Sequence, residues 1–317
     1  ALVLCIVARA TTVQVIDGLK YIIYTDQNYA VLTANNYKAE KIDIPASITW
    51  EGKKYPVTEL GNGCFKDCWS LTSITIPSSV KSLGEGCFLG LRLTSITLPS
   101  SVTSFGDWCF SRCDKLKSIT IPSSVTSLGK GCFYQCSSLT SITIPSSVTS
   151  IGEWCFSSCD KLKSIVIPSS VTSLGSYCFS DCSSLESITI PSSVKSLGEG
   201  CFSSCYSLYS VNIQSPNIKL GTECFVSTTI TDFTIMATPP PAISGDCFKS
   251  CSIDKAKLMV PKASVSSYQN AAVWKDFGTI TAVDGGEVAG ECEKPSIGYA
   301  CGKLKFGCQT PGAEYHY

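Results

Sequence analysis

The sequence predicts a β-dominated solenoid in which short parallel strands stack along one axis. The dipeptide Cys-Phe occurs nine times, and each step between copies is 23 residues except one of 22. Pro-Ser-Ser-Val occurs six times in phase with it, first at Pro77 and last at Pro191. A fixed period of roughly 20–50 residues is the signature of repeat architectures. The whole chain is therefore interpreted from one repeating unit.

The first half of the unit predicts a strand. In the copy at 139–144, Leu-x-x-Ile-x-Ile places Ile142 and Ile144 inward and Thr143 outward, because side chains alternate along a strand. Pro145 ends this strand, since it has no N–H to donate to the ladder.

The second half of the unit returns the chain to the next strand. Val148 and Ile151 provide a second inward pair on the return limb. Glycine occupies the position of Gly152 in eight of the nine copies, and we expect the backbone there to need a positive φ or a close approach to another segment. Cys-Phe-x-x-Cys predicts a single helical or 3₁₀ turn that places Cys155 and Cys159 on one side.

The units must fold together. A lone unit buries too few apolar side chains to offset the entropy of ordering its 23 residues, so the array has to stack. Strands about 4.8 Å apart give a nine-turn stack of roughly 40 Å. The phenylalanines then form a structural core ladder of Phe65, Phe88, Phe110, Phe133, Phe156, Phe179, Phe202, Phe225 and Phe248.

The unit Leu-x-x-Ile-x-Ile-Pro-x-x-Val-x-x-Ile-Gly-x-x-Cys-Phe-x-x-Cys resembles the BspA-like leucine-rich repeat over about residues 40–262. The resemblance implies a curved, right-handed leucine-rich-repeat solenoid of the α/β horseshoe class, with a parallel sheet along its concave face. It also implies a surface protein of anaerobic bacteria or some parasitic protists, several of which are associated with adhesion to host matrix proteins. The family usually has Ala at the first cysteine, so Cys155 and its equivalents depart from the pattern.

The first ten residues indicate export. Residues 2–8 are apolar, and Ala8-Arg9-Ala10 follows as a small-x-small signal, so we interpret residues 1–10 as the remnant of a signal peptide. The alternative is a first buried strand; the run is too short to span a bilayer. We expect a secreted or cell-surface protein.

Residues 11–60 are predicted to form an N-terminal cap and a degenerate first repeat. Strand-like runs at 19–24 and 29–32 form a hairpin that covers the open edge of the sheet. A strand at 42–45 follows, and then a hairpin from Trp50 to Pro56.

The repeats are predicted over 61–262, with a last strand-like piece at 258–260. Residues 263–283 form a C-terminal cap whose amphipathic helix runs from Ser264 to Phe277. A linker is expected at 284–291. Residues 292–317 alternate in the manner of strands and are interpreted as the truncated start of a β-sandwich-like domain.

The chain has twenty cysteines, sixteen of them in the repeats: nine at the first position of Cys-Phe-x-x-Cys and seven at the second, where Leu91 and Thr228 replace the other two. We expect two columns of buried thiols that act as small hydrophobic side chains. Disulfides between stacked neighbours are the alternative, since Cα atoms one strand apart fall within the ~4.4–6.8 Å bridging range. A continuous ladder does not bring four ligands to one point, which disfavours zinc. Cys292, Cys301 and Cys308 belong to the next domain.

The outward strand positions stack into columns. They are interpreted either as a solvated β-face or as a hydroxyl-rich platform for a protein or glycan. One column contains Thr75, Thr97, Thr120, Thr143, Val166, Thr189 and Asn212, and another contains Thr72, Thr94, Lys117, Thr140, Lys163, Glu186 and Tyr209.

Aromatic residues gather at a second candidate surface. Trp108, Trp154 and Tyr177 precede the first cysteine, where four other repeats have glycine. Trp108 and Trp154 flank Gly131, so each ring can lie across the space that this glycine leaves. The alternatives are packing at the rim of the solenoid and a ridge on which a sugar or peptide stacks.

The composition excludes several functions. Lys plus Arg and Asp plus Glu are balanced at 25 each, which argues against nucleic acid and against an anionic membrane as partners. No stretch of the repeats approaches transmembrane length, so we expect no insertion of the repeats into a membrane. The single histidine, His316, is next to the last residue, so His-based catalysis within the repeats is excluded. We therefore expect no enzyme, cofactor or metal, but a monomeric adhesion or recognition module for an extracellular protein or glycan. The alternative is a spacer that displays a further domain.

Overall fold

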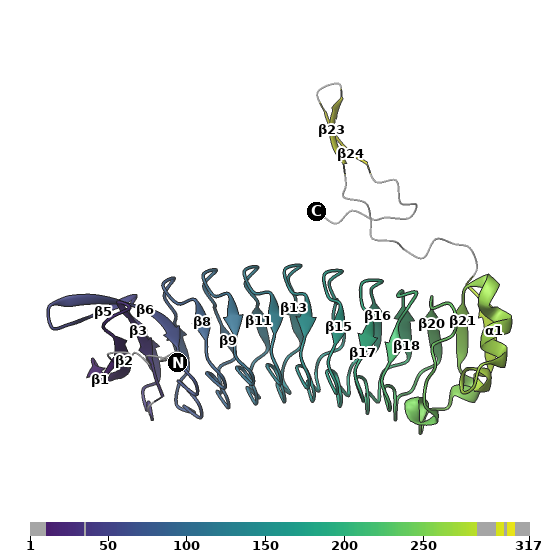
Figure 1. Ribbon diagram of the computed structural model, residues 1–317, viewed down its shortest axis with the longest axis horizontal. Helices are drawn as coiled ribbons and strands as arrows, with labels where there is room; N and C mark the ends of the chain where they lie inside the picture. The colour runs from purple at the N-terminus through teal and green to yellow at the C-terminus, as the bar shows by residue number, and fades with distance from the viewer. Residues whose placement is uncertain (1–10, 35, 284–295, 301–302, 308–317) are drawn as a thin grey trace, which may run out of the picture.

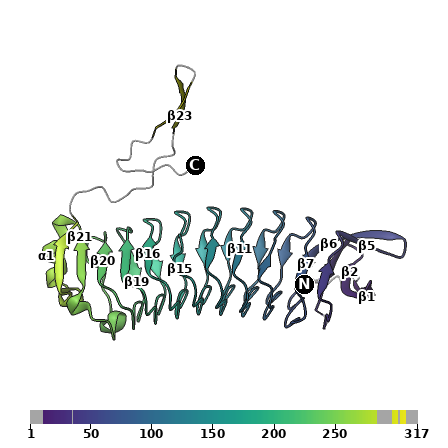
Figure 2. The same cartoon turned by 180° about the vertical axis from the view of Figure 1, so that it is seen from behind.

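The computed structural model describes residues 11–34, 36–283, 296–300 and 303–307. Residues 36–283 form an elongated solenoid of about eleven stacked turns, shown from opposite sides in Figures 1 and 2. The predicted solenoid is confirmed. Each turn has three sides: a strand, a return limb and a Cys-Phe turn.

The strands build a parallel sheet along one side, here called the first sheet. Ile119 lies beside Ile142 and Thr120 beside Thr143, so equivalent residues of neighbouring turns are in register. Ile142 and Ile144 are buried and Thr143 is exposed, as predicted. What we call the first sheet consists of three hydrogen-bonded segments: β4 (Lys41–Asp43) and β7 (Ser73–Thr75); β9 (Ser95–Ile96), β11 (Ser118–Thr120) and β13 (Ser141–Thr143); and β16 (Ser187–Ile190), β18 (Ser210–Ile213), β20 (Asp232–Ile235), β21 (Lys257–Val260) and β22 (Thr279–Ala282).

A second parallel sheet runs along the return limb, where the resemblance implied only one sheet. Leu128 pairs with Ile151, and both side chains are buried. The sheet forms because each return limb is extended and its backbone polar groups pair with the turns on either side. What we call the second sheet consists of two hydrogen-bonded segments: β6 (Lys53–Leu60), β8 (Ser82–Leu83) and β10 (Ser104–Phe105); and β12 (Ser127–Leu128), β14 (Ser150–Ile151), β15 (Ser173–Leu174), β17 (Ser196–Leu197) and β19 (Lys219–Leu220).

The Cys-Phe segments form the third side as hydrogen-bonded turns. In the copy at 154–159, the N–H groups of Ser157 and Cys159 donate to the carbonyl oxygens three residues back, so the predicted single turn forms but does not extend into a helix. Trp154 and Ser158 both have φ of 58°, which interrupts right-handed helical geometry. The N–H of Phe156 instead donates to the carbonyl oxygen of Cys178 in the next turn, at 2.8 Å. Among the described Cys-Phe segments, only the last is a 3₁₀ helix, Gly245–Phe248 (η1).

The nine phenylalanines are buried and lie in one row, as predicted. Neighbouring ring centroids are 5.1–5.7 Å apart and the ring planes deviate by 2–16°. Tyr37 packs on Phe65 at one end, with its centroid at 5.4 Å. Trp274 packs on Phe248 at the other end, at 5.7 Å. The core is therefore a ladder that is closed by an aromatic ring at each end.

The glycine column at the end of the return limb sets the distance between turns. A Cβ on Gly175 would lie 2.4 Å from the backbone nitrogen of Glu153 in the preceding turn. A Cβ on Gly198 would lie 2.3 Å from the nitrogen of Ser176. Close backbone approach therefore requires glycine here.

The N-terminal segment is a β-meander attached to the second sheet. The predicted strands are β2 (Leu19–Tyr24) and β3 (Tyr29–Leu32), and β1 (Thr11–Ile16), which was not predicted, pairs with β2. β3 runs parallel to β6. The predicted hairpin around residues 50–56 consists of β5 (Ser47–Trp50) and β6.

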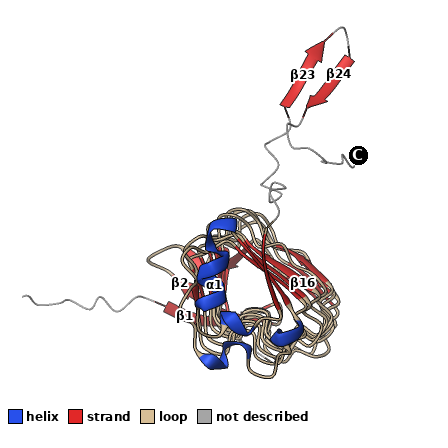
Figure 3. Cartoon of the chain, turned by 90° about the vertical axis from the view of Figure 1, so that its right-hand side faces the viewer, coloured by secondary structure: helices blue, strands red, loops and turns tan. Residues whose placement is uncertain are grey.

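The C-terminal segment lies across the end of the stack, as the view along the solenoid in Figure 3 shows. The predicted helix over 264–277 is wrong in length: α1 spans only Val265–Asn270, between the 3₁₀ turns η3 (Lys262–Ser264) and η4 (Trp274–Asp276). Ala271 is extended and Val273 has φ of 69°, which turns the Trp274 ring into the core. β22 then adds a strand beyond β21.

Further along, β23 (Ser296–Ala300) and β24 (Lys303–Gly307) form an antiparallel pair. Their strand character is as predicted, and the β-sandwich remains a prediction. The signal-peptide remnant at 1–10, the linker at 284–291 and Cys292, Cys301 and Cys308 lie outside the described residues.

Candidate binding surfaces

The outer face of the first sheet brings the predicted hydroxyl column together. Thr120 lies beside Thr143 and Thr189 beside Asn212 on paired strands. The four threonines predicted as candidate binding residues, Thr97, Thr120, Thr143 and Thr189, are all exposed. Val166 interrupts the column and is 82% exposed. The face therefore presents repeated hydroxyl groups around one large apolar side chain.

The neighbouring column supplies the charges of this face. Lys117, Lys163 and Tyr209 are exposed as expected. Lys163 Nζ lies 3.7 Å from Glu186 Oε1 of the next turn. Because this ion pair is solvent-exposed, its contribution to stability is small, and both groups stay accessible to a partner.

A shallow groove of about 960 Å³ lies along the C-terminal half of the first sheet. Val166 and Thr189 line it together with the corner residues Pro168, Pro191 and Met236. Sequence reasoning missed the groove, because the prolines were interpreted only as strand ends. The prolines recur at the same position of each repeat, and this repetition could have indicated the groove because it places their rings along one edge of the sheet.

The aromatic residues pack mainly against one another. A Cβ on Gly131 would lie 2.0 Å from Cε3 of Trp108, so this indole covers Gly131 as predicted. Trp154 does not lie across Gly131; it stacks on Tyr177 with centroids 4.4 Å apart. Tyr134, which the sequence did not single out, packs edge-on against both tryptophans. These contacts favour rim packing over a sugar-stacking ridge.

The ring of Tyr177 covers a glycine of the following repeat. A Cβ on Gly200 would lie 2.4 Å from its ring, and its hydroxyl donates to Glu199 Oε1 at 2.5 Å. This hydrogen bond to the carboxylate raises the pKa of Tyr177 to about 12. The tyrosine therefore stays neutral across the physiological range.

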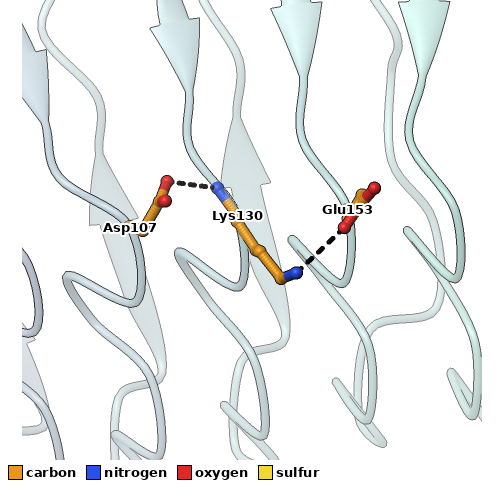
Figure 4. Close-up of polar contacts among 3 residues, drawn as sticks. All are labelled: Asp107, Lys130 and Glu153. Carbon is orange, nitrogen blue, oxygen red and sulfur yellow. Dashed lines mark hydrogen bonds and ion pairs between the residues drawn. The ribbon is translucent and has the colours of Figure 1, made fainter.

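Polar side chains also connect successive turns beside the aromatic row. Asp107 Oδ1 accepts a hydrogen bond from the backbone N–H of Lys130 at 2.8 Å, and Lys130 Nζ lies 3.0 Å from Glu153 Oε2 (Figure 4). Asn62 makes the same contact with the N–H of Glu85, at 2.9 Å. These residues connect turns and leave no convergent acid and base.

The sixteen repeat cysteines are free thiols, and only Cys251 is not fully buried. In the second column, thiols reach the preceding turn: Cys159 Sγ donates to the carbonyl oxygen of Phe133 at 3.3 Å, and Cys182 Sγ to that of Phe156 at 3.1 Å. Burial raises the pKa of Cys182 from its ordinary 9.0 to about 12. The Cys182 thiol is therefore a protonated core group.

Within the described ranges, no three His, Cys, Asp or Glu side chains are placed to hold a metal ion. Across the same residues, no helix has the length and apolar character needed to cross a membrane.

A stack of parallel β-strand turns around a ladder of apolar side chains defines a leucine-rich-repeat solenoid. The BspA-type leucine-rich repeat matches six copies, over residues 58–169 and 127–254, which together cover more than half of the chain. The chain therefore belongs to the BspA-type leucine-rich-repeat family, which confirms the resemblance. Repeats of this type are generally non-catalytic modules.

Several solved structures are similar. A leucine-rich repeat protein of T. pallidum is 29% identical, with 66% of this chain and 86% of that chain covered and a TM-score of 0.47. A leucine-rich cell surface protein of Faecalibacterium prausnitzii is 22% identical, with 87% and 96% covered and a TM-score of 0.49. The pneumococcal vaccine antigen PcpA is 14% identical, with 87% and 100% covered and a TM-score of 0.48. No curated protein matches the chain.

Proposed function

We propose that the repeats form a non-catalytic binding module of a secreted or cell-surface protein, which contacts an extracellular protein or glycan through the first sheet. The observation that carries the proposal is the exposed hydroxyl column of Thr97, Thr120, Thr143 and Thr189, which continues along the groove beside Val166. Repeat solenoids present extended surfaces of this kind to large partners.

The chemistry of the face suits recognition. Each threonine hydroxyl both donates and accepts hydrogen bonds, which matches backbone amides and sugar hydroxyls equally. Val166 and Met236 give the groove an apolar centre surrounded by polar groups, the composition found in protein interfaces. Tyr209, which is 46% exposed, adds an amphipathic ring near the same face.

The test is binding of the purified protein to immobilised matrix proteins and to a glycan array. The double variant Thr143→Lys/Thr189→Lys places two bulky cations on the face, and we expect it to weaken any binding found by about tenfold or more. The matched control is Thr149→Lys/Thr172→Lys, at exposed positions just before β14 and β15 of the second sheet, where equivalent turns already carry Lys81 and Lys195. Equal losses in both variants would contradict the proposal.

The alternative is a structural spacer that displays a further domain. The elongated stack of near-identical turns favours it, because such a solenoid sets a fixed distance between its two ends (Figure 1). If the protein is a spacer, we expect no binding in either screen. In a cell-surface assay, we then expect a longer repeat array to extend the reach of the displayed domain.

A further inference from the structure

A different groove, of about 920 Å³, lies where the Cys-Phe turns lead into the first sheet; we call it the corner groove. Its lining residues flank the second cysteine of the Cys-Phe-x-x-Cys segments. In the copy where Leu91 replaces this cysteine, they flank Leu91. The corner groove spans the turns from Asp67 to Asp181 and shares no lining residue with the groove on the first sheet.

The N-terminal end of the corner groove is cationic and aromatic. Arg92 and Arg112 are exposed on adjacent turns, and among the described residues neither guanidinium forms an ion pair. Trp69 lies beside them and is 67% exposed. The carboxylates here are Asp67 and Asp114, and Asp114 Oδ2 lies 3.4 Å from Lys115 Nζ. With Lys115 counted, three cations face two carboxylates at this end.

The C-terminal end of the corner groove is anionic. Asp160 and Asp181 lie on adjacent turns and form no ion pair among the described residues. Burial and the neighbouring Asp181 raise the pKa of Asp160. Tyr206 follows one turn beyond and is 58% exposed. The intervening lining residues, Gln135, Ser137 and Ser158, are neutral.

We propose that the corner groove binds an extended polypeptide segment that carries an acidic side chain at the arginines and a basic side chain at the aspartates. Two to four turns separate an arginine from an aspartate, or roughly 10–19 Å at the spacing of stacked strands. An extended peptide rises about 3.3 Å per residue, so the partner's acid and base are about three to six residues apart.

The mixed charge of the groove selects this class of partner. Charged glycans and nucleic acids are polyanions, which would match the arginines and then face Asp160 and Asp181. A polypeptide carries both signs on one chain, and arginine binds carboxylates through two parallel hydrogen bonds. The exposed rings of Trp69 and Tyr206 lie at opposite ends and supply the aromatic anchors that dominate protein interfaces.

The repeat itself tolerates changes at these positions. The residue before the second cysteine position is Asp67, Gly90, Arg112, Gln135 or Ser158 in successive turns, each with positive φ. Their diversity within one fold makes charge reversal a usable probe.

The experiment measures the fluorescence anisotropy of short labelled Gly-Ser peptides added to the full chain. One peptide carries a glutamate pair and a lysine pair about four residues apart; the controls carry only glutamates, only lysines, or adjacent pairs. We expect the spaced mixed peptide to bind at least about tenfold more tightly than each control, which corresponds to ~1.4 kcal/mol, and to weaken as salt is added.

Charge reversal then tests the placement. Arg92→Asp/Arg112→Asp makes the groove wholly acidic and should switch the preference to the all-lysine peptide, whereas Asp160→Lys/Asp181→Lys should switch it to the all-glutamate peptide. Misfolding cannot produce such opposite gains. Equal affinity of the native chain for all four peptides, or an unchanged preference in both variants, would overturn the inference. Thr143→Lys/Thr189→Lys should bind the peptide normally, which separates this site from the function proposed for the first sheet.

Discussion

At the scale of single residues, the position before the first cysteine shows how near-identical turns specialise. Its backbone is left-handed in every described copy from 63 to 223, with glycine in four of them. Trp108 adopts φ of 58°, which is costly for a residue with a Cβ. Its ring covers Gly131 of the next turn, and Tyr177 covers Gly200 in the same way. Aromatic residue and glycine therefore act as complementary partners across turns.

This pairing predicts different costs for the same substitution at two glycines. Gly63→Ala and Gly131→Ala both place alanine at positive φ, but only the Cβ at 131 collides with an indole, since Gly63 has no contact closer than 3.7 Å. We expect about 1 kcal/mol lost for Gly63→Ala and a further ~1–3 kcal/mol for Gly131→Ala. Urea unfolding measures both. Trp108→Ala should cancel the extra cost at 131, and equal costs at the two glycines would contradict the packing.

The thiol columns make stability depend on alkaline pH. Burial raises the folded-state pKa of Cys182 and Cys247 from 9.0 to about 12. A raised folded pKa contributes stability that is fully present below the unfolded value and is lost as the pH rises through the folded one.

We therefore expect the melting temperature, measured under reducing conditions, to be constant from pH 7 to about 8.5 and to fall progressively from about pH 9 upward. At pH 8 the buried repeat cysteines should resist a thiol reagent that reacts with all of the cysteines in denaturant, because burial blocks access to them. A flat melting temperature through pH 11, or rapid labelling of the buried repeat cysteines in the native protein, would show that the columns are not sealed.

At the scale of elements, the sequence predicted those structural features that recur in every repeat. The strand, its inward isoleucines and the phenylalanine ladder follow from a period sampled nine times. The second sheet was missed because its strands contribute only two residues per turn, too few for an alternating pattern. The helix over 264–277 was overextended because nothing in the polar pattern marks the left-handed Val273. The candidate surfaces were predicted as columns, but Tyr134 and both grooves depend on contacts between turns, which one repeat does not encode.

The C-terminal segment is expected to be a stabilising closure. Trp274 is 1% exposed, packs on Phe233, Phe248 and Phe277, and donates its indole N–H to the carbonyl oxygen of Pro241 at 2.9 Å. Trp274→Ala should lower the free energy of unfolding by about 3–5 kcal/mol. The control is Trp69→Ala, whose side chain is mostly exposed and should change stability by less than about 0.5 kcal/mol. Similar losses in both would contradict an end-closing role.

At the scale of the whole molecule, each turn contacts only its neighbours, so the array is quasi-one-dimensional. Deleting residues 133–155 removes one full period and joins Cys132 to Phe156, which restores the Cys-Phe motif. We expect this variant to fold cooperatively with a urea m-value reduced by roughly a tenth, in proportion to the surface removed. Deleting residues 133–143 joins Cys132 to Ile144, out of phase, and should abolish the folded circular dichroism signal. If the two deletion variants folded equally well, the stacked register would be contradicted.

The orientation of the hydrogen bonds between turns has a mechanical consequence. Bonds such as that from the Phe156 N–H to the carbonyl oxygen of Cys178 join one turn to the next, along the length of the stack. Tension applied between the two ends therefore pulls along these hydrogen bonds. The bonds between one pair of turns can break before those between the next pair, and the bonds of many turns are not sheared together. Such a tether yields one turn at a time, and each yielding turn releases about 80 Å of extended chain, so the protein would lengthen under flow by even increments before it breaks.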